Sequence, residues 1–92
     1  MITINEQKGF TLTFNNGWTI SVQIGHMNYC ANKNNGPFNK TWCTNSEPCI
    51  NAEIAIWDSE DNWYAFDDPE QEVKGWVSTD DVALWIEKVK GW

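Results

Sequence analysis

The chain has 92 residues, a length typical of one domain, and 41% of them are hydrophobic. Its formal net charge is −7, divided as +2 over residues 1–46 and −9 over residues 47–92, and its cationic side chains are all lysines. Direct nucleic-acid binding requires cationic side chains that displace counterions from phosphate, so this composition argues against it. An acidic surface suits a basic protein partner, or serves only to keep the protein in solution.

Targeting signals and cysteines indicate a compartment. No stretch approaches the ~18 consecutive apolar residues of a membrane span. Residues 1–6 have neither the basic nor the apolar region of a signal peptide. We therefore expect a cytoplasmic protein, no membrane contact and three reduced cysteines, whose odd number also argues against a disulfide framework. Seven tryptophans are more than so small a core can bury, so part of the aromatic surface should be exposed.

The first predicted elements are two strands joined by a tight turn. Residues 10–14 and 18–24 alternate apolar and polar side chains, and Asn15-Asn16-Gly17 lies between them. A three-residue loop that pairs Phe14 with Trp18 places all their apolar residues on one face, whereas a two-residue turn would not. We therefore predict the longer loop, with Gly17 in the left-handed conformation. Residues 2–4 are a candidate for a short additional strand.

A long loop is predicted over residues 25–49, which are rich in asparagine, glycine and lysine. Residues 50–57 alternate again, and the polar turn 58–62 leads to a predicted returning strand at 63–66. This pairing puts Ile56 opposite Tyr64 and Ile54 opposite Phe66 on the core face. It also puts Trp57 opposite Trp63 on the face away from the core. Residues 73–77 fit a short strand or an extended lead-in to the next element.

A helix is predicted from Ser78 to the last residues of the chain. Ser78 is a suitable N-cap, and two aspartates follow in the first turn, where the helix dipole favours negative charge. Gly91 suits the position after the helix. The stripe expected to face the sheet consists of Val82, Trp85, Ile86 and Val89. The sequence thus predicts a single α+β domain over residues 1–92, an antiparallel sheet of four to five strands with one C-terminal helix packed on one face.

Two groups of residues could in principle support metal binding. Zinc is the first possibility, since its favoured ligands are spaced as H-x3-C-x12-C-x5-C at His26, Cys30, Cys43 and Cys49. The spacing lacks a tight C-x2-C pair, so structural thiols are the preferred interpretation and a zinc-stabilised module is the alternative. For calcium, residues 58–69 lack the glycine and the final glutamate of an EF-hand loop, which favours a solvated turn.

Catalytic signals are weak. The only pairing of a nucleophile with a base is Cys30 with His26, and no third residue is in a recognisable position to orient the base. The chain also lacks the glycine-rich motifs that bind nucleotide phosphates. We therefore expect no enzymatic activity and no cofactor.

Seven carboxylates and no cation occupy residues 58–72, and we call this group the acidic belt. Its members are Asp58, Glu60, Asp61, Asp67, Asp68, Glu70 and Glu72. Beside the belt, Trp57 and Trp63 could supply the aromatic anchors that dominate protein interfaces. The predicted binding face therefore consists of the belt and these two tryptophans, and its partner would be a protein with a basic surface. The alternative interpretation is a solvated edge that only aids solubility.

Three stretches carry a resemblance that covers well over half of the chain. They are residues 14–25 (FNNGWTISVQIG) with 28–30 (NYC), residues 51–58 (NAEIAIWD) with 62–63 (NW), and residues 73–78 (VKGWVS). They resemble a loose group of small tailed-bacteriophage accessory proteins of unassigned function. Cys43 and Cys49 lie outside the matching stretches.

Some phage accessory products block host defences, as anti-CRISPR and anti-restriction proteins do. The resemblance implies a phage-encoded accessory protein in the host cytoplasm. Combined with the acidic belt, it leads us to expect a protein that inhibits a host defence or nucleic-acid-binding protein through that belt. The resemblance brings no known active site. A structural or assembly protein of the virion is a further alternative, and the sequence does not specify the oligomeric state.

Overall fold

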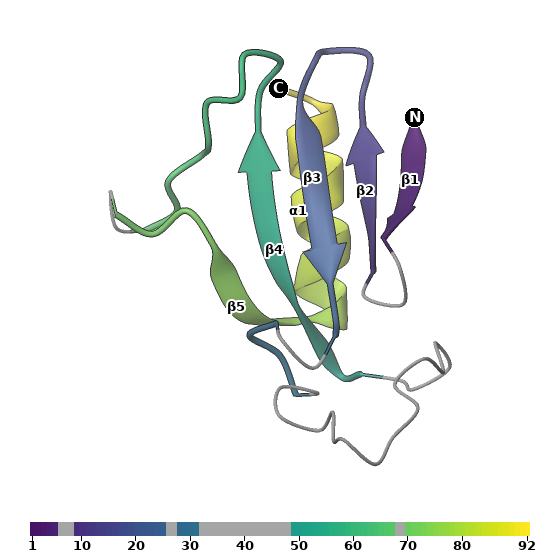
Figure 1. Cartoon of the computed structure of the whole chain (residues 1–92), viewed down its shortest axis with the longest axis vertical. Helices are drawn as coiled ribbons and strands as arrows, with labels where there is room; N and C mark the ends of the chain where they lie inside the picture. The colour runs from purple at the N-terminus through teal and green to yellow at the C-terminus, as the bar shows by residue number, and fades with distance from the viewer. Residues whose placement is uncertain (6–8, 26–27, 32–48, 68–69) are drawn as a thin grey trace.

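The computed structural model describes residues 1–5, 9–25, 28–31, 49–67 and 70–92, which form an antiparallel sheet and one helix (Figure 1). The sheet is a meander in which the five strands follow one another in chain order. Its strands are β1 (Ile2–Asn5), β2 (Gly9–Thr13), β3 (Thr19–Gln23), β4 (Asn51–Trp57) and β5 (Lys74–Ser78), and the helix is α1 (Thr79–Lys90). This arrangement confirms the predicted α+β fold with a C-terminal helix on the sheet.

The first hairpin has the predicted register. Phe10 pairs with Val22 and Leu12 with Ile20, which places their apolar side chains on one face. The Phe14 N–H donates to the Trp18 carbonyl at 2.9 Å. Gly17 has a φ of 91°, the left-handed conformation that a three-residue loop requires at this position. The short strand suggested at residues 2–4 is also present as β1, on the edge of the sheet.

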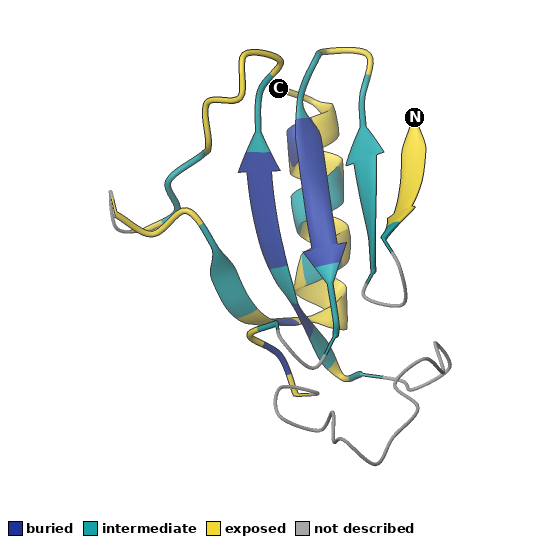
Figure 2. Ribbon diagram, in the orientation of Figure 1, coloured by how far each residue is buried: buried dark blue, intermediate teal, exposed yellow. Residues whose placement is uncertain are grey.

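The core lies between the sheet and α1. Ile20, Ile54, Ile56 and Val89 are fully buried, and β3 and β4 form the buried centre of the sheet (Figure 2). The helix packs on β3, β4 and β5. Of the predicted stripe only Val89 is fully buried, whereas its other members, Trp85 included, are half-buried against the core.

Each end of α1 is capped by a hydrogen bond between residues close in sequence. The Ser78 hydroxyl accepts a hydrogen bond from the Asp81 N–H at 3.2 Å, as predicted for the N-cap. Gly91 follows the helix, but its φ of −92° is not left-handed. Its N–H donates to the Lys88 carbonyl at 3.1 Å, so the helix ends in a tightened last turn.

The predicted returning strand at residues 63–66 is wrong. Trp57 and Trp63 form an isolated bridge, and the Tyr64 N–H donates to the Ile56 carbonyl at 2.8 Å, but the pairing goes no further. Beyond this point β5 occupies the place beside β4, with Ile54 opposite Lys74. The Phe66 N–H instead donates to the Gln71 carbonyl at 2.9 Å, so the chain turns locally. The rings of Tyr64 and Phe66 then pack on Trp85 of the helix.

Several predicted positions lie outside the described residues, namely His26, Cys43, Asp68 and most of the predicted 25–49 loop. No helix among the described segments is long and apolar enough to cross a membrane.

Candidate protein-binding face

Two stacked tryptophans form the aromatic part of the candidate face. Trp57 ends β4, and its bridge to Trp63 brings the two indoles to the same side of the chain. Their ring centroids are 5.1 Å apart, with an interplanar angle of 27°. Trp63 is 44% exposed, whereas Trp57 is half-buried. The structure therefore brings together the two aromatic residues that the sequence predicted to pair.

The turn at residues 58–62 is shaped by its first carboxylate. One oxygen of Asp58 accepts hydrogen bonds from the N–H groups of Glu60 at 2.8 Å and Asn62 at 2.9 Å. The other oxygen accepts from the Asn62 side chain at 3.2 Å. The Asn62 N–H, more than the other donors, holds the pKa of Asp58 below its ordinary value of 3.8. Asp58 thus has a structural role, because its two oxygens accept the hydrogen bonds that hold the turn.

The tip of this turn presents charge to solvent. Glu60 and Asp61 are both exposed. Asp61 has a φ of 62°, a left-handed conformation that aspartate tolerates better than most residues. The tip therefore places two carboxylates next to the Trp57–Trp63 pair.

The lower part of the acidic belt is an irregular segment. Asp67, Glu70 and Glu72 are all exposed, and Asp67 forms an ion pair with Lys74 at 3.3 Å. Asp68 lies outside the described residues. The belt follows the side of the sheet opposite β1 (Figure 1). Its carboxylates come from a turn and a loop, so a regular strand does not set their spacing.

A second aromatic pair was not predicted from the sequence. Tyr29 and Trp76 are 48% and 58% exposed, and their ring centroids are 5.6 Å apart. The Trp76 N–H donates to the Tyr29 carbonyl at 2.8 Å, and Trp76 has a φ of 50°, which is strained for an aromatic residue. The excess of tryptophan predicted exposed rings. It could not identify these two, because their contact depends on how a distant loop meets β5.

The segment that carries Tyr29 is fixed against β4 and β5. The Glu53 carboxylate accepts from the Tyr29 N–H at 2.8 Å and from the Asn28 side chain at 3.1 Å. A Cβ on Gly75 would lie 2.7 Å from the Cβ of Tyr29, so only glycine allows this close approach. Glu53 and Trp57 lie on the same face of β4, which is the face opposite the core. The two aromatic pairs therefore lie toward opposite ends of β4.

The predicted zinc ligands are only partly described. Cys30 is 1% exposed, and its thiol donates to the Gly25 carbonyl at 3.6 Å. Cys49 is half-buried, and both thiols are free of disulfides. Within the described ranges no three His, Cys, Asp or Glu side chains are close enough to hold a metal ion. Because His26 and Cys43 lie outside those ranges, the zinc-stabilised alternative stays a prediction.

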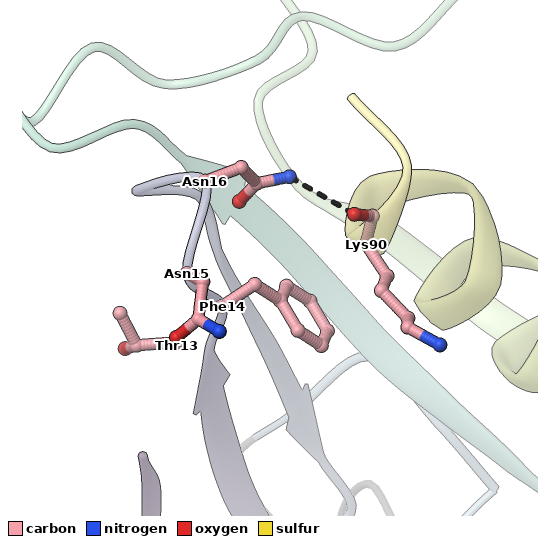
Figure 3. Close-up of a pocket in the computed structure, with 5 residues that line it drawn as sticks. All are labelled: Thr13, Phe14, Asn15, Asn16 and Lys90. Atoms are coloured by element: carbon pink, nitrogen blue, oxygen red, sulfur yellow. Dashed lines mark hydrogen bonds between the residues drawn. The ribbon is translucent and has the colours of Figure 1, made fainter.

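An open hollow of about 420 Å³ lies between the first hairpin and the C-terminal end of α1 (Figure 3). It is lined by Thr13, Phe14, Asn15, Asn16 and Lys90. The Asn16 amide within it donates to the carbonyls of Val89 at 2.8 Å and Lys90 at 3.2 Å. Among the described residues that line the hollow, Lys90 is the one with an ionisable side chain.

Comparison of the chain with protein-family models, characterised proteins and solved structures gave no match. The candidate face is therefore defined by its own geometry, which is a stacked tryptophan pair beside exposed carboxylates.

Proposed function

We propose that this is a binding protein that uses the acidic belt and the Trp57–Trp63 pair to occupy a basic surface of another protein. One observation carries the proposal. Trp63 is 44% exposed and stacked on Trp57, directly beside the exposed carboxylates of the 58–62 turn. Indole rings supply the buried contact area that dominates interface energies, and surrounding charges supply specificity.

The negative charge of this face favours association with a basic surface. The net charge of −7 attracts a basic surface over a distance of about 10 Å at moderate salt, which raises the association rate. Residues 58–72 contribute seven carboxylates without a cation, and the Asp67–Lys74 ion pair neutralises one of them. Glu60 and Asp61 are exposed beside the aromatic pair, so encounter with a basic partner is favoured there over the rest of the molecule.

The partner class follows from what basic protein surfaces normally bind. Surfaces that bind DNA or RNA carry lysine and arginine for phosphate, and carboxylates can occupy the same positions. The resemblance to small bacteriophage proteins makes a host defence nuclease or another nucleic-acid-binding host protein the favoured partner. The protein would then act in the host cytoplasm by blocking that site, without binding nucleic acid itself and without catalysis.

The proposal is tested by capturing the partner from host lysate with the full chain and measuring its binding kinetics. Glu60→Lys should reduce the association rate about tenfold at low salt, because the substitution reverses a charge beside the aromatic pair. Glu87→Lys, which changes an exposed glutamate on α1 by the same charge, is the matched control and should have little effect. Equal losses in the two variants would show that only net charge matters, and would overturn the assigned face.

The aromatic contribution is tested in the same assay. Trp63→Ala should weaken binding by about 2 kcal/mol or more, the range of interface hot spots. Trp76→Ala removes a ring that is more exposed, 58% against 44%, from the second aromatic pair and should leave affinity unchanged. A loss in Trp76→Ala with none in Trp63→Ala would move the binding site to the Tyr29–Trp76 pair. Thermal melts establish that both variants are folded.

A further inference from the structure

Within the part of the chain that the structure describes, β1 pairs with β2 on one side and with no strand on its outer edge. The Thr13 N–H donates to the Met1 carbonyl at 2.8 Å, and the strand register continues with Ile2 opposite Leu12 and Ile4 opposite Phe10. Hydrogen-bonded and non-hydrogen-bonded pairs alternate along an antiparallel ladder. Thr3 therefore directs its N–H and C=O toward β2, whereas Ile2 and Ile4 direct theirs away from the sheet.

The same two isoleucines expose their side chains. Ile2 is 70% and Ile4 76% exposed, and β1 is the most exposed strand of the sheet (Figure 2). Their partners Leu12 and Phe10 pack against the core, so all four side chains belong to the face that carries α1. The helix packs farther along, on β3, β4 and β5. Within β1 there is no proline, lysine or other charge of the kind that normally protects an edge strand.

The β1 edge differs in charge from the rest of the molecule. The described residues from 1 to 25 include no charged side chain, and the two charges in the sequence over that range, Glu6 and Lys8, cancel. The whole net charge of −7 therefore belongs to residues 26–92. Two copies of so acidic a protein repel each other through most of their surface, but they can approach through the β1 edge.

We propose that β1 pairs with β1 of a second copy, antiparallel and related by a two-fold axis. The outward groups fix the register, because Ile2 must lie opposite Ile4 of the second copy for both residues to exchange hydrogen bonds. Thr3 then lies opposite Thr3 on the axis. The pairing joins two five-stranded sheets into one and gathers four isoleucines on its helix-bearing face.

The edge fits a second copy better than an unrelated partner. A two-fold interface requires a patch complementary to itself, and a neutral strand with alternating isoleucines meets that requirement in both hydrogen bonding and side-chain contact. The acidic belt lies on the opposite side of the sheet from β1 (Figure 1). Pairing therefore leaves both belts exposed, at the two ends of the joined sheet. The short edge predicts a weak, reversible dimer.

Sedimentation velocity on the full chain, from micromolar to millimolar concentration, tests the pairing. The wild type should shift from monomer to dimer as concentration rises. Ile4→Lys should remain a monomer throughout, because it places a charge at the seam. Ile50→Lys adds the same charge at an isoleucine that is 77% exposed before β4, and should dimerise like the wild type. A wild type that stays monomeric, or dimerisation of Ile4→Lys equal to wild type, would overturn the proposal.

A disulfide test fixes the register independently of affinity. Thr3→Cys, made with Cys43→Ser and Cys49→Ser to remove competing thiols, should oxidise to a covalent dimer. The two position-3 Cα atoms would be about 4.5 Å apart across the axis, within disulfide range. Ile2→Cys in the same background places its two sulfur-bearing residues diagonally, about 8 Å apart, and should cross-link poorly. Equal cross-linking at the two positions would exclude the proposed register.

Discussion

At the scale of single residues, Asn16 joins the turn of the first hairpin to the C-terminal end of α1. Its side-chain oxygen accepts from the Trp18 N–H at 2.9 Å and so shapes the first turn. Its amide donates to the carbonyls of Val89 at 2.8 Å, and of Lys90 and Trp92 at 3.2 Å each. The last carbonyls of a helix have no partner within the helix. The Val89 carbonyl also accepts from the Trp92 N–H at 3.2 Å, so the Asn16 amide adds a second donor there and further donors for Lys90 and Trp92.

Replacing Asn16 should therefore destabilise the fold. Asn16→Asp keeps the acceptor for the Trp18 N–H but removes the donor and places a carboxylate at the negative end of α1. We expect a loss of about 1–3 kcal/mol in the free energy of unfolding, measured by urea denaturation. Asn15→Asp, at the exposed neighbouring position, introduces the same charge and is the control. Equal stability of the two variants would show that the contact with the helix contributes nothing.

Asp58 gives a pH-dependent prediction at the same scale. Hydrogen bonds lower its folded-state pKa below 3.8, so its stabilisation of the turn is present above that value. The stabilisation is lost as the pH falls through the lower, folded-state pKa. In an NMR titration the amide signals of Glu60 and Asn62 should shift with a midpoint below 3.8. Asp58→Asn, which keeps an acceptor oxygen but cannot titrate, should abolish that transition, and a wild-type midpoint at or above 3.8 would contradict the assigned role.

At the scale of elements, local rules explain what the sequence could predict. The first hairpin and α1 were predictable because turn residues, side-chain alternation and the Ser78 cap act within a few residues. The segment at 63–66 was not, because alternation shows which face a residue takes but not which strand lies beside it. Lys74 occupies the place opposite Ile54, and Phe66 packs on Trp85 with ring centroids 5.1 Å apart.

This ring cluster makes Trp85 an attachment of the helix in addition to the fully buried Val89. Its ring also contacts Tyr64 at 5.9 Å, and the Lys88 ammonium lies 4.6 Å from its centroid. Trp85→Ala should reduce the free energy of unfolding by about 3 kcal/mol, the lower part of the range for large aromatic truncations because the residue is half-buried. Leu84→Ala, at a position 66% exposed on the same helix, should cost less than about 0.5 kcal/mol. A thermal melt of Trp85→Ala that matches this control would show that the helix is held by other contacts.

At the scale of the whole molecule, charge and aromatic surface are distributed unevenly. The strands β1, β2 and β3 carry no charged side chain, whereas the acidic belt lies between β4 and β5. This asymmetry was visible in the sequence, because the acidic residues are contiguous there. The structural role of Asp58, the ion pair of Asp67 and the Tyr29–Trp76 pair were not visible, because each depends on chain geometry or on residues distant in sequence.

The contact between Asn16 and the end of α1 also sets an order of events during synthesis. Strands β2 and β3 can pair as soon as residues 9–23 are available, since the hairpin uses only neighbouring sequence. The carbonyl acceptors of the Asn16 amide follow at least 73 residues later. During elongation the residues of this hairpin are therefore available before the helix that covers the sheet, and their apolar side chains are open to aggregation or to a chaperone. The complete core can form only after Val89, which is fully buried in it, has been synthesised.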